Sequence, residues 1–179
     1  MAGKKGKWRV VTMEWVDDPG EELGVDRKLV IGRREWIGLP ALGIEAMHGK
    51  TDTGAYNSSI HAEEVSTFDK EGEEWVSFLT HAQSGKEVRC EAPVSFRKRV
   101  KSSTGVGRMR IFVRTKFRSP RGLEWQVDLS LADRREMQFP LLIGRRALKS
   151  RFVVDTSRSH LLGPLSGLTG HGWRQGKKK

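Results

Sequence analysis

The clearest pattern in the chain is an alternation of hydrophobic and polar residues. Apolar side chains stand at every second position from Trp125 to Leu131, as in a half-buried β-strand. Residues 108–117 alternate in the same way, and shorter β-type runs cover 10–16, 75–80, 88–94 and 152–154. Only residues 145–150 have a helical pattern. We therefore predict an all-β, closed or folded-over architecture with one short C-terminal helix.

Length and composition are those of one globular domain. The chain has 179 residues, of which 36% are hydrophobic and 31% are charged. Cys90 is the single cysteine, so an internal disulfide is excluded and a reducing compartment is favoured. No apolar run approaches the roughly 20 residues that cross a bilayer, and the N-terminus lacks a secretion signal. We expect a cytoplasmic protein without membrane contact.

The positive charge is concentrated at the two termini and in one internal block. The net charge is +11, and residues 1–9 and 174–179 supply eight of these charges without a single acid. Residues 97–121 contain ten bases and no acid. Charged tails are usually solvated, whereas an internal block must lie on folded structure. The internal block is therefore the stronger indication of an acidic partner.

Two short strings carry the candidate chemistry. The first is Thr51-Asp52-Thr53-Gly54-Ala55, and the second, at 139–145, reads Phe-Pro-Leu-Leu-Ile-Gly-Arg. Each string is ordinary by itself, because aspartate and glycine are common in turns. Between them lies a β-rich segment with a glycine-containing hairpin, and one helical turn and a last strand follow the second string. This order resembles the retropepsin-type aspartic proteases, in which one chain is half an enzyme.

Residues 29–163 resemble one bacterial family more closely. Four strings carry the resemblance in the same order, at 31–40, 50–62, 97–110 and 133–145. The family is labelled ATP-dependent zinc protease, but it is better described as a retropepsin-like aspartic endopeptidase. Some members are linked to a ligase that adds glutamates to a ribosomal protein, which implies trimming of glutamate chains. Thr51 departs from the apolar residue expected before the aspartate.

The resemblance also implies how the chain is divided. We expect a retropepsin-like protease domain at 29–163, adopting a closed β-barrel. A basic N-terminal tail with a lead-in strand, 1–28, would precede the domain. A basic C-terminal tail, 164–179, would follow it.

One Asp-Thr-Gly triplet per chain implies that two chains share a catalytic pair. Two carboxylates about 3 Å apart cannot both ionise, so one takes a proton from water while the other polarises the scissile carbonyl. We therefore predict a homodimer in which Asp52 faces the partner subunit's Asp52. Gly54 allows the two loops to approach closely, and the Thr53 hydroxyl ties them together. This chemistry needs neither a metal nor another cofactor.

A second acidic string, Val153-Val154-Asp155-Thr156-Ser157, offers an alternative pair within one chain. An Asp52/Asp155 pair would require two complete lobes, for which the chain is short. No second apolar-Gly strand and helix follow Asp155. In the retropepsin plan this position belongs to the terminal interface strand.

The basic block is predicted to lie on a hairpin that closes over the substrate. The retropepsin plan has such a flap between the two strings, and 102–107 is its natural tip because it is polar and rich in glycine. Cations around a cleft attract an acidic chain, and arginine binds carboxylates bidentately. We therefore predict an acidic, glutamate-rich peptide substrate. The residues predicted to bind it are Ala55, His61, Arg97, Arg99, Lys101, Ser103, Gly105, Arg108, Arg110 and Arg145.

A basic module that binds nucleic acid or the ribosome without catalysis is the main alternative. Basic tails and a basic strand pair bind phosphates in a salt-dependent manner, so weak contact with ribosomal RNA is one expected role of the tails. The block contains only Phe112 and Phe117 as aromatic residues, which disfavours base stacking. The chain has no His-Glu-x-x-His string and no phosphate-binding glycine loop, so zinc and nucleotide sites find no support.

Overall fold

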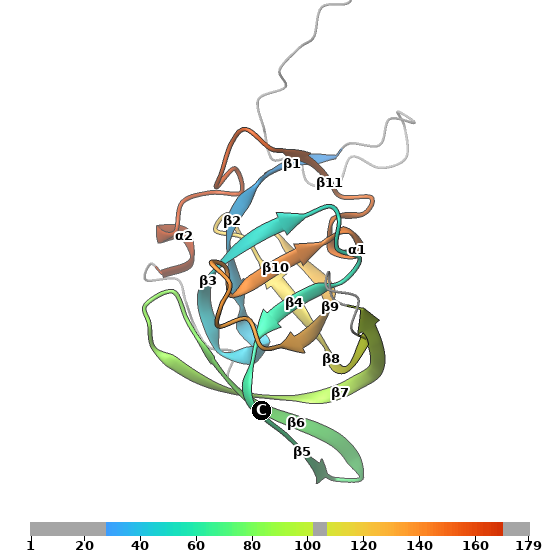
Figure 1. The fold of residues 1–179 in the computed structure, drawn as a ribbon. Helices are drawn as coiled ribbons and strands as arrows, with labels where there is room; N and C mark the ends of the chain where they lie inside the picture. The colour runs from blue at the N-terminus through green and yellow to red at the C-terminus, as the bar shows by residue number, and fades with distance from the viewer. Residues whose placement is uncertain (1–27, 102–106, 170–179) are drawn as a thin grey trace, which may run out of the picture.

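A computed structural model describes residues 28–101 and 107–169 (Figure 1). Its strands are β1 (Leu29–Gly32), β2 (Arg34–Leu39), β3 (Ile44–Asp52), β4 (Ser58–His61), β5 (Glu63–Lys70), β6 (Glu73–His81), β7 (Glu87–Lys101), β8 (Gly107–Arg118), β9 (Glu124–Ala132), β10 (Leu141–Gly144) and β11 (Phe152–Asp155). Its helices are η1 (Pro40–Leu42), α1 (Arg145–Leu148) and α2 (Ser166–Thr169). The all-β prediction is therefore confirmed, and the strand predicted at 10–16 lies outside the described residues.

The C-terminal part of the chain differs from the prediction. The single predicted helix is present as α1, but a second short helix, α2, follows in the segment expected to be a basic tail. Leu168 of α2 is buried, and a Cβ atom at Gly167 would lie 2.3 Å from the carbonyl oxygen of Pro120. The packing of α2 depends on this close approach, which no periodic pattern in four residues could have indicated.

Nine strands form one curved sheet in the order β2-β3-β10-β4-β9-β8-β7-β6-β5. β2 also pairs with β8 through one residue pair, Gly38 and Arg118. The curvature of the sheet thus brings together two strands that are not neighbours in its order. β1 and β11 form a separate parallel pair. Figure 1 shows the β5–β6 hairpin projecting from the end of the molecule opposite β1 and β11.

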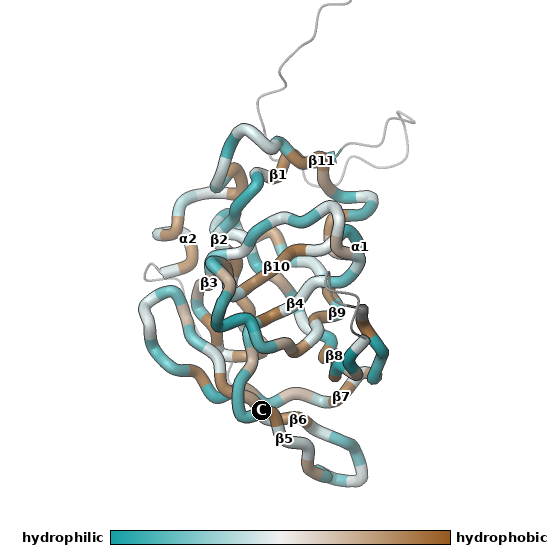
Figure 2. The backbone as a smooth tube through the Cα atoms, viewed as in Figure 1, coloured by the Kyte–Doolittle hydropathy of each residue, from teal (hydrophilic) through white to brown (hydrophobic). Residues whose placement is uncertain are grey.

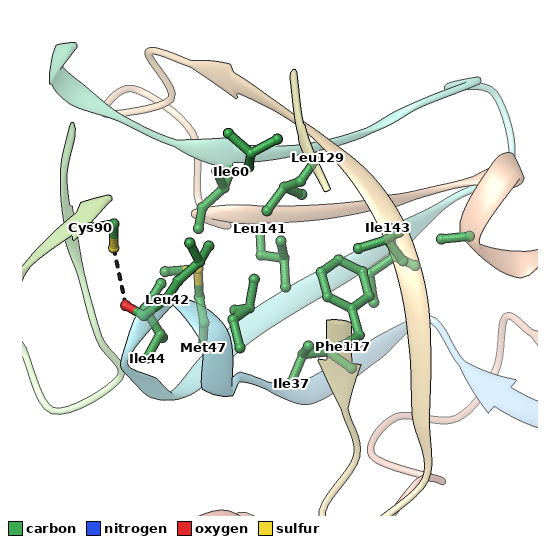
Figure 3. Packing of buried hydrophobic residues seen from close by; sticks show 14 of the residues in the cluster. Ile37, Leu42, Ile44, Met47, Ile60, Cys90, Phe117, Leu129, Leu141 and Ile143 are labelled. Atoms are coloured by element: carbon green, nitrogen blue, oxygen red, sulfur yellow. Dashed lines mark hydrogen bonds between the residues drawn. The ribbon is translucent and has the colours of Figure 1, made fainter. Parts of the chain in front are cut away.

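The hydrophobic core lies on the inner side of the curved sheet. Side chains from β3, β4, β9 and β10 converge there, among them Met47, Ile60, Leu129 and Leu141 (Figure 3). In Figure 2 hydrophobic stretches follow these central strands, while the β5–β6 hairpin is largely hydrophilic. Trp125, like Leu129, is buried, as the alternation along β9 predicted.

Cys90 belongs to this core. Its Sγ–H donates to the carbonyl oxygen of Leu42 at 3.3 Å (Figure 3). Burial raises the pKa of the thiol to about 12. Because a thiol must ionise to act as a nucleophile, Cys90 has a packing role.

A buried carboxylate joins β2 to the segment after β11. Glu35 accepts backbone hydrogen bonds from Gly32 at 2.6 Å, from Leu161 at 3.0 Å and from Leu162 at 3.1 Å. Burial raises the pKa of Glu35, although the three N–H groups act in the opposite direction. A Cβ atom at Gly32 would lie 2.8 Å from the carbonyl oxygen of Arg158, so glycine is required where the two segments meet.

Two histidines stack on one tryptophan beside this joint. The ring centroids of His48 and His160 lie 4.2 and 5.0 Å from that of Trp36. The Nε2 atoms of the two histidines are 3.0 Å apart. Burial, followed by the charges of His160 and Arg34, lowers the pKa of His48 to about 4.

This arrangement predicts a loss of stability in acid. The unfolded chain binds a proton at His48 near the ordinary pKa of about 6.5, whereas the folded chain binds it only near pH 4. We therefore expect the free energy of unfolding to fall as pH drops from about 6.5 to about 4. Urea unfolding at several pH values measures this loss, which should be smaller in His48→Gln. The exposed His81→Gln variant serves as the control, and an equal loss in all three proteins would contradict the prediction.

Candidate active site

The two predicted strings lie side by side. β10 runs parallel to β3, and its last residue, Gly144, is paired with Asp52. A Cβ atom at Gly144 would lie 2.5 Å from the carbonyl carbon and oxygen of Asn57. Only glycine therefore lets the end of β10 pass this close to the loop that follows Asp52.

Backbone N–H groups hold the Asp52 carboxylate. Its Oδ1 atom accepts hydrogen bonds from Gly54 at 2.9 Å and from Ala55 at 3.0 Å. In the described part of the chain no hydrogen bond involves its Oδ2 atom, and the residue is only partly buried. One oxygen is thus fixed in place while the other remains free to take part in chemistry.

Thr51 fits its unusual position through its hydroxyl group. The side chain is buried, and Oγ1 donates to the carbonyl oxygen of Gly32 at 3.1 Å. The Thr51 N–H donates to the carbonyl oxygen of Arg33 at 3.1 Å. The threonine in place of an apolar residue therefore leaves its own buried polar groups paired and ties β3 to the connection between β1 and β2.

Arg145 holds the loop that follows Asp52 through hydrogen bonds to the backbone of that loop. Its Nη1 atom donates to the carbonyl oxygens of Thr53 at 3.0 Å and Gly54 at 3.1 Å. Its backbone N–H donates to the carbonyl oxygen of Ala55 at 2.8 Å. The guanidinium of Arg145 thus binds the loop itself, and its contact with substrate stays a prediction.

Arg134 is a candidate site residue that the sequence analysis did not single out. Its Nε atom donates to the carbonyl oxygen of Phe139 at 3.2 Å and its Nη1 atom to Oγ of Ser59 at 3.2 Å. Burial lowers the pKa of Arg134, the charge of Arg110 lowers it further, and the Asp52 carboxylate raises it. Arg134 therefore lies within electrostatic range of both Arg110 and Asp52. It belongs to a run of charged residues, 133–136, and nothing in that run marks which side chain points inward.

His61 is buried beside Arg134. Its Nδ1 atom accepts the backbone N–H of Arg134 at 2.9 Å, so Nε2 carries the proton and donates to Oε1 of Glu63 at 3.1 Å. Both ring nitrogens are thus occupied. In this position His61 holds the backbone of the 133–139 loop, and its contact with substrate stays a prediction.

The basic block is divided among different surroundings. Arg97 is held by a bidentate ion pair with Glu74, at 2.7 and 3.1 Å, and Arg99 donates to the carbonyl oxygen of Gly107 at 3.4 Å. Arg108 is exposed, whereas Arg110 is half-buried. Lys101 ends β7, and Ser103 and Gly105 lie outside the described residues with the rest of the predicted flap tip. Of these residues, Arg110 is the one whose charge acts on Arg134.

Asp155 is engaged within its own turn. Oδ1 accepts hydrogen bonds from the backbone N–H and the hydroxyl of Ser157 at 2.8 and 2.6 Å, and Oδ2 accepts one from Arg158 at 2.7 Å. These bonds hold the pKa of Asp155 well below its usual range. Asp155 also stands on the separate β1–β11 pair, opposite Gly32. This geometry gives the Asp52/Asp155 alternative no support.

The metal-ligating residue types and the helices were compared with what a metal site or a membrane span requires, in the described residues alone. No group of three or more His, Cys, Asp or Glu side chains there is arranged to hold a metal ion. No helix in this part of the chain is long and apolar enough to cross a membrane.

Curated proteins with related sequences are named for a ligase. The chain is 40% identical over 141 residues to the "Probable alpha-L-glutamate ligase" of Shewanella pealeana, covering 77% of this chain and 31% of that protein. It is 38% identical over 142 residues to the protein of the same name from Desulfotalea psychrophila, covering 78% and 30%. The chain therefore spans about a third of the length of these relatives.

A solved structure and a family model identify the fold and the family. The crystal structure of Lpg0085, a Legionella pneumophila protein of unknown function, matches with a TM-score of 0.61 at 22% identity, covering 74% of this chain and 97% of that one. The family model described as "RimB-like: Retropepsin-like aspartic endopeptidase RimB" matches residues 30–163. The loop that holds Asp52, the strand end at Gly144 and this match together place the chain in the RimB-like family of retropepsin-like aspartic endopeptidases.

Proposed function

We propose that the chain is one half of a dimeric aspartic endopeptidase that hydrolyses acidic, glutamate-rich peptide chains. The observation that carries this proposal is the state of Asp52, with Oδ1 held by two N–H groups and Oδ2 free. In the aspartic-protease mechanism such a carboxylate acts on water together with a second acid beside it. The described part of the chain offers no second free carboxylate at this loop, since Asp155 is bound in its own turn.

In the proposed reaction the two carboxylates share one proton. The ionised carboxylate takes a proton from water while the protonated one polarises the scissile carbonyl and later supplies the proton to the leaving amine. The hydrogen bonds from Gly54 and Ala55 keep the Asp52 carboxylate oriented. Those from Arg145 to the Thr53 and Gly54 carbonyls keep the loop itself in place.

The β7–β8 hairpin is proposed as the flap over this site. Nζ of Lys98, on β7, lies 5.9 Å from the ring centroid of Tyr56, and the guanidinium carbon of Arg145 lies at the same distance. Tyr56 itself is 55% exposed, so much of its side chain is accessible to a ligand. An extended peptide between these two segments would pass Asp52.

Two observations favour an acidic substrate. The half-buried Arg134 lies within electrostatic range of both Asp52 and Arg110, and neighbouring cations attract carboxylates. The ligase name of the relatives concerns glutamate, and a hydrolase associated with such a ligase would act on glutamate chains. The nucleic-acid alternative is weakened because ion pairs neutralise much of the basic block, including Arg97 with Glu74, Arg114 with Asp128 and Arg118 with Glu124.

The proposal predicts that activity depends on protein concentration. We expect peptides of repeated glutamate to be cleaved, and the specific activity to rise with concentration in parallel with a dimer fraction measured by sedimentation. Matched glutamine peptides test the preference for charge, and mass spectrometry identifies the bond cut. Cleavage whose specific activity stays constant while the protein sediments as a monomer would contradict the shared pair. Absence of cleavage by the sedimenting dimer, from acid to neutral pH, would contradict the protease assignment.

A further inference from the structure

We propose that Arg110 and Arg134 form a carboxylate-binding pair that selects an acidic substrate side chain beside Asp52. The proposal rests on the proposed function, because it assigns the substrate preference of that site to two particular side chains. Among the many bases of the second half of the chain, these two share a position in the fold that the others lack.

The strand register brings the two side chains to one face of the sheet. Phe112 on β8 is paired with Ser130 on β9, which is paired with Ser59 on β4. Ile60 and Val113 belong to the core cluster, so their neighbours Ser59 and Phe112 point to the opposite face. Arg110 lies two residues before Phe112 and shares its face.

Arg134 reaches the same face from the loop after β9. It lies two residues beyond the end of β9 and donates to Oγ of Ser59. The guanidinium of Arg134 therefore lies on the face of the sheet that also carries Arg110. The charge of Arg110 acts on the pKa of Arg134, as expected for guanidinium groups that are close in space.

The charge of the Asp52 carboxylate acts on Arg134, but in the described residues no ion pair neutralises either cation of the pair. Within the described residues, neither Arg110 nor Arg134 forms an ion pair with a carboxylate, whereas Arg97, Arg114 and Arg118 each do. Two half-buried cations within electrostatic range of each other repel, and part of their hydration is lost. A bound carboxylate removes both costs, which is the reason to infer an acidic ligand here.

The unused hydrogen-bond donors fit one carboxylate. Arg134 employs Nε and Nη1 in its bonds to Phe139 and Ser59, which leaves its Nη2 group. The described residues give Arg110 no hydrogen-bond partner, so its planar fork is available for bidentate binding. Arg134 is anchored and Arg110 is unanchored, so the first orients the ligand and the second completes its binding.

Binding measurements on the full chain test the pair separately from catalysis. Fluorescence anisotropy would follow a labelled glutamate peptide and its glutamine counterpart on protein carrying Asp52→Asn, which keeps the peptides intact. Arg110→Gln should weaken binding of the glutamate peptide about tenfold or more and that of the glutamine peptide less than about threefold. Arg114→Gln is the matched control, because it removes the same charge from the same strand while Asp128 keeps its ion pair with Arg146.

The possible outcomes separate the pair from the proposed function. Equal weakening of both peptides by Arg110→Gln, or equal effects of Arg110→Gln and Arg114→Gln, would overturn the pair. Selective binding that depends on Arg110 in a protein without hydrolysis would support the pair and reject the protease. Hydrolysis whose preference for glutamate over glutamine is unchanged in Arg110→Gln would support the protease and reject the pair. Arg134→Gln, checked for a native melting transition, should show the same selectivity loss as Arg110→Gln.

Discussion

Asp52→Asn is expected to lower the rate of peptide hydrolysis about a thousandfold or more. Asparagine keeps an oxygen that can accept the N–H groups of Gly54 and Ala55, so the loop keeps its shape. It cannot take a proton from water, and general acid–base catalysis alone contributes about 10²–10⁴ in rate. In a symmetric dimer the substitution removes both carboxylates of the pair. Single-turnover hydrolysis of a glutamate peptide measures the loss.

Mixed dimers provide the sharper form of this experiment. If each active site needs Asp52 from both chains, an equal mixture of wild type and Asp52→Asn retains about a quarter of the wild-type activity after subunit exchange. A site complete within one chain would retain about half.

Asp155→Asn is the companion variant, because an Asp52/Asp155 pair would make it as inactive as Asp52→Asn. We expect Asp155→Asn to remain active, since that carboxylate serves its own turn.

Glu35→Leu is expected to lower the free energy of unfolding by about 3 kcal/mol or more. The substitution leaves the N–H groups of Gly32, Leu161 and Leu162 without their acceptor, and each unpaired buried donor costs about 1–3 kcal/mol. Glu35 is fully buried, so water does not replace the carboxylate. Urea unfolding at pH 7 measures the loss.

Two companion variants show whether the hydrogen bonds are the cause. Glu35→Gln keeps one oxygen for Gly32 and Leu161, so its loss should be clearly smaller than that of Glu35→Leu. Glu91→Leu, at an exposed position on β7, should change the stability by no more than about 0.5 kcal/mol. Equal losses in Glu35→Leu and Glu91→Leu would show that the joint between β2 and the segment after β11 contributes little.

Local patterns predicted the strands because burial of a strand is itself periodic. The alternation from Trp125 to Leu131 corresponds to β9, and the turn residues of 119–122 separate β8 from β9 as expected. The helix predicted at 145–150 begins at Arg145, directly after the Gly144 that pairs with Asp52. In each case the residues that form the sequence pattern are those that form the strand, turn or helix, or lie within a few residues of them.

The sequence shows how many basic residues the chain has. It does not show where their side chains lie in the fold or which acids they contact. The sequence shows ten bases in 97–121, but Glu74, which binds Arg97, lies on another strand. Arg134 stands outside that block and was not singled out, although the charge of Asp52 acts on it. An ion pair or a guanidinium bound to Ser59 depends on which strands are neighbours, and composition does not contain that information.

The sequence by itself determined the all-β class, the aspartate loop, the glycine-ended strand and the resemblance to one family, because each depends on residues that are close in the chain. Only the tertiary structure decided which polar groups meet. It brings Arg145 to the carbonyl groups of the loop after Asp52 and His61 to the 133–139 segment. It also brings Glu35 to the segment after β11 and Arg110 within electrostatic range of Arg134. Hydrogen bonds and charge–charge interactions act over a few ångströms in space, whereas their partners here stand up to 127 residues apart in the chain.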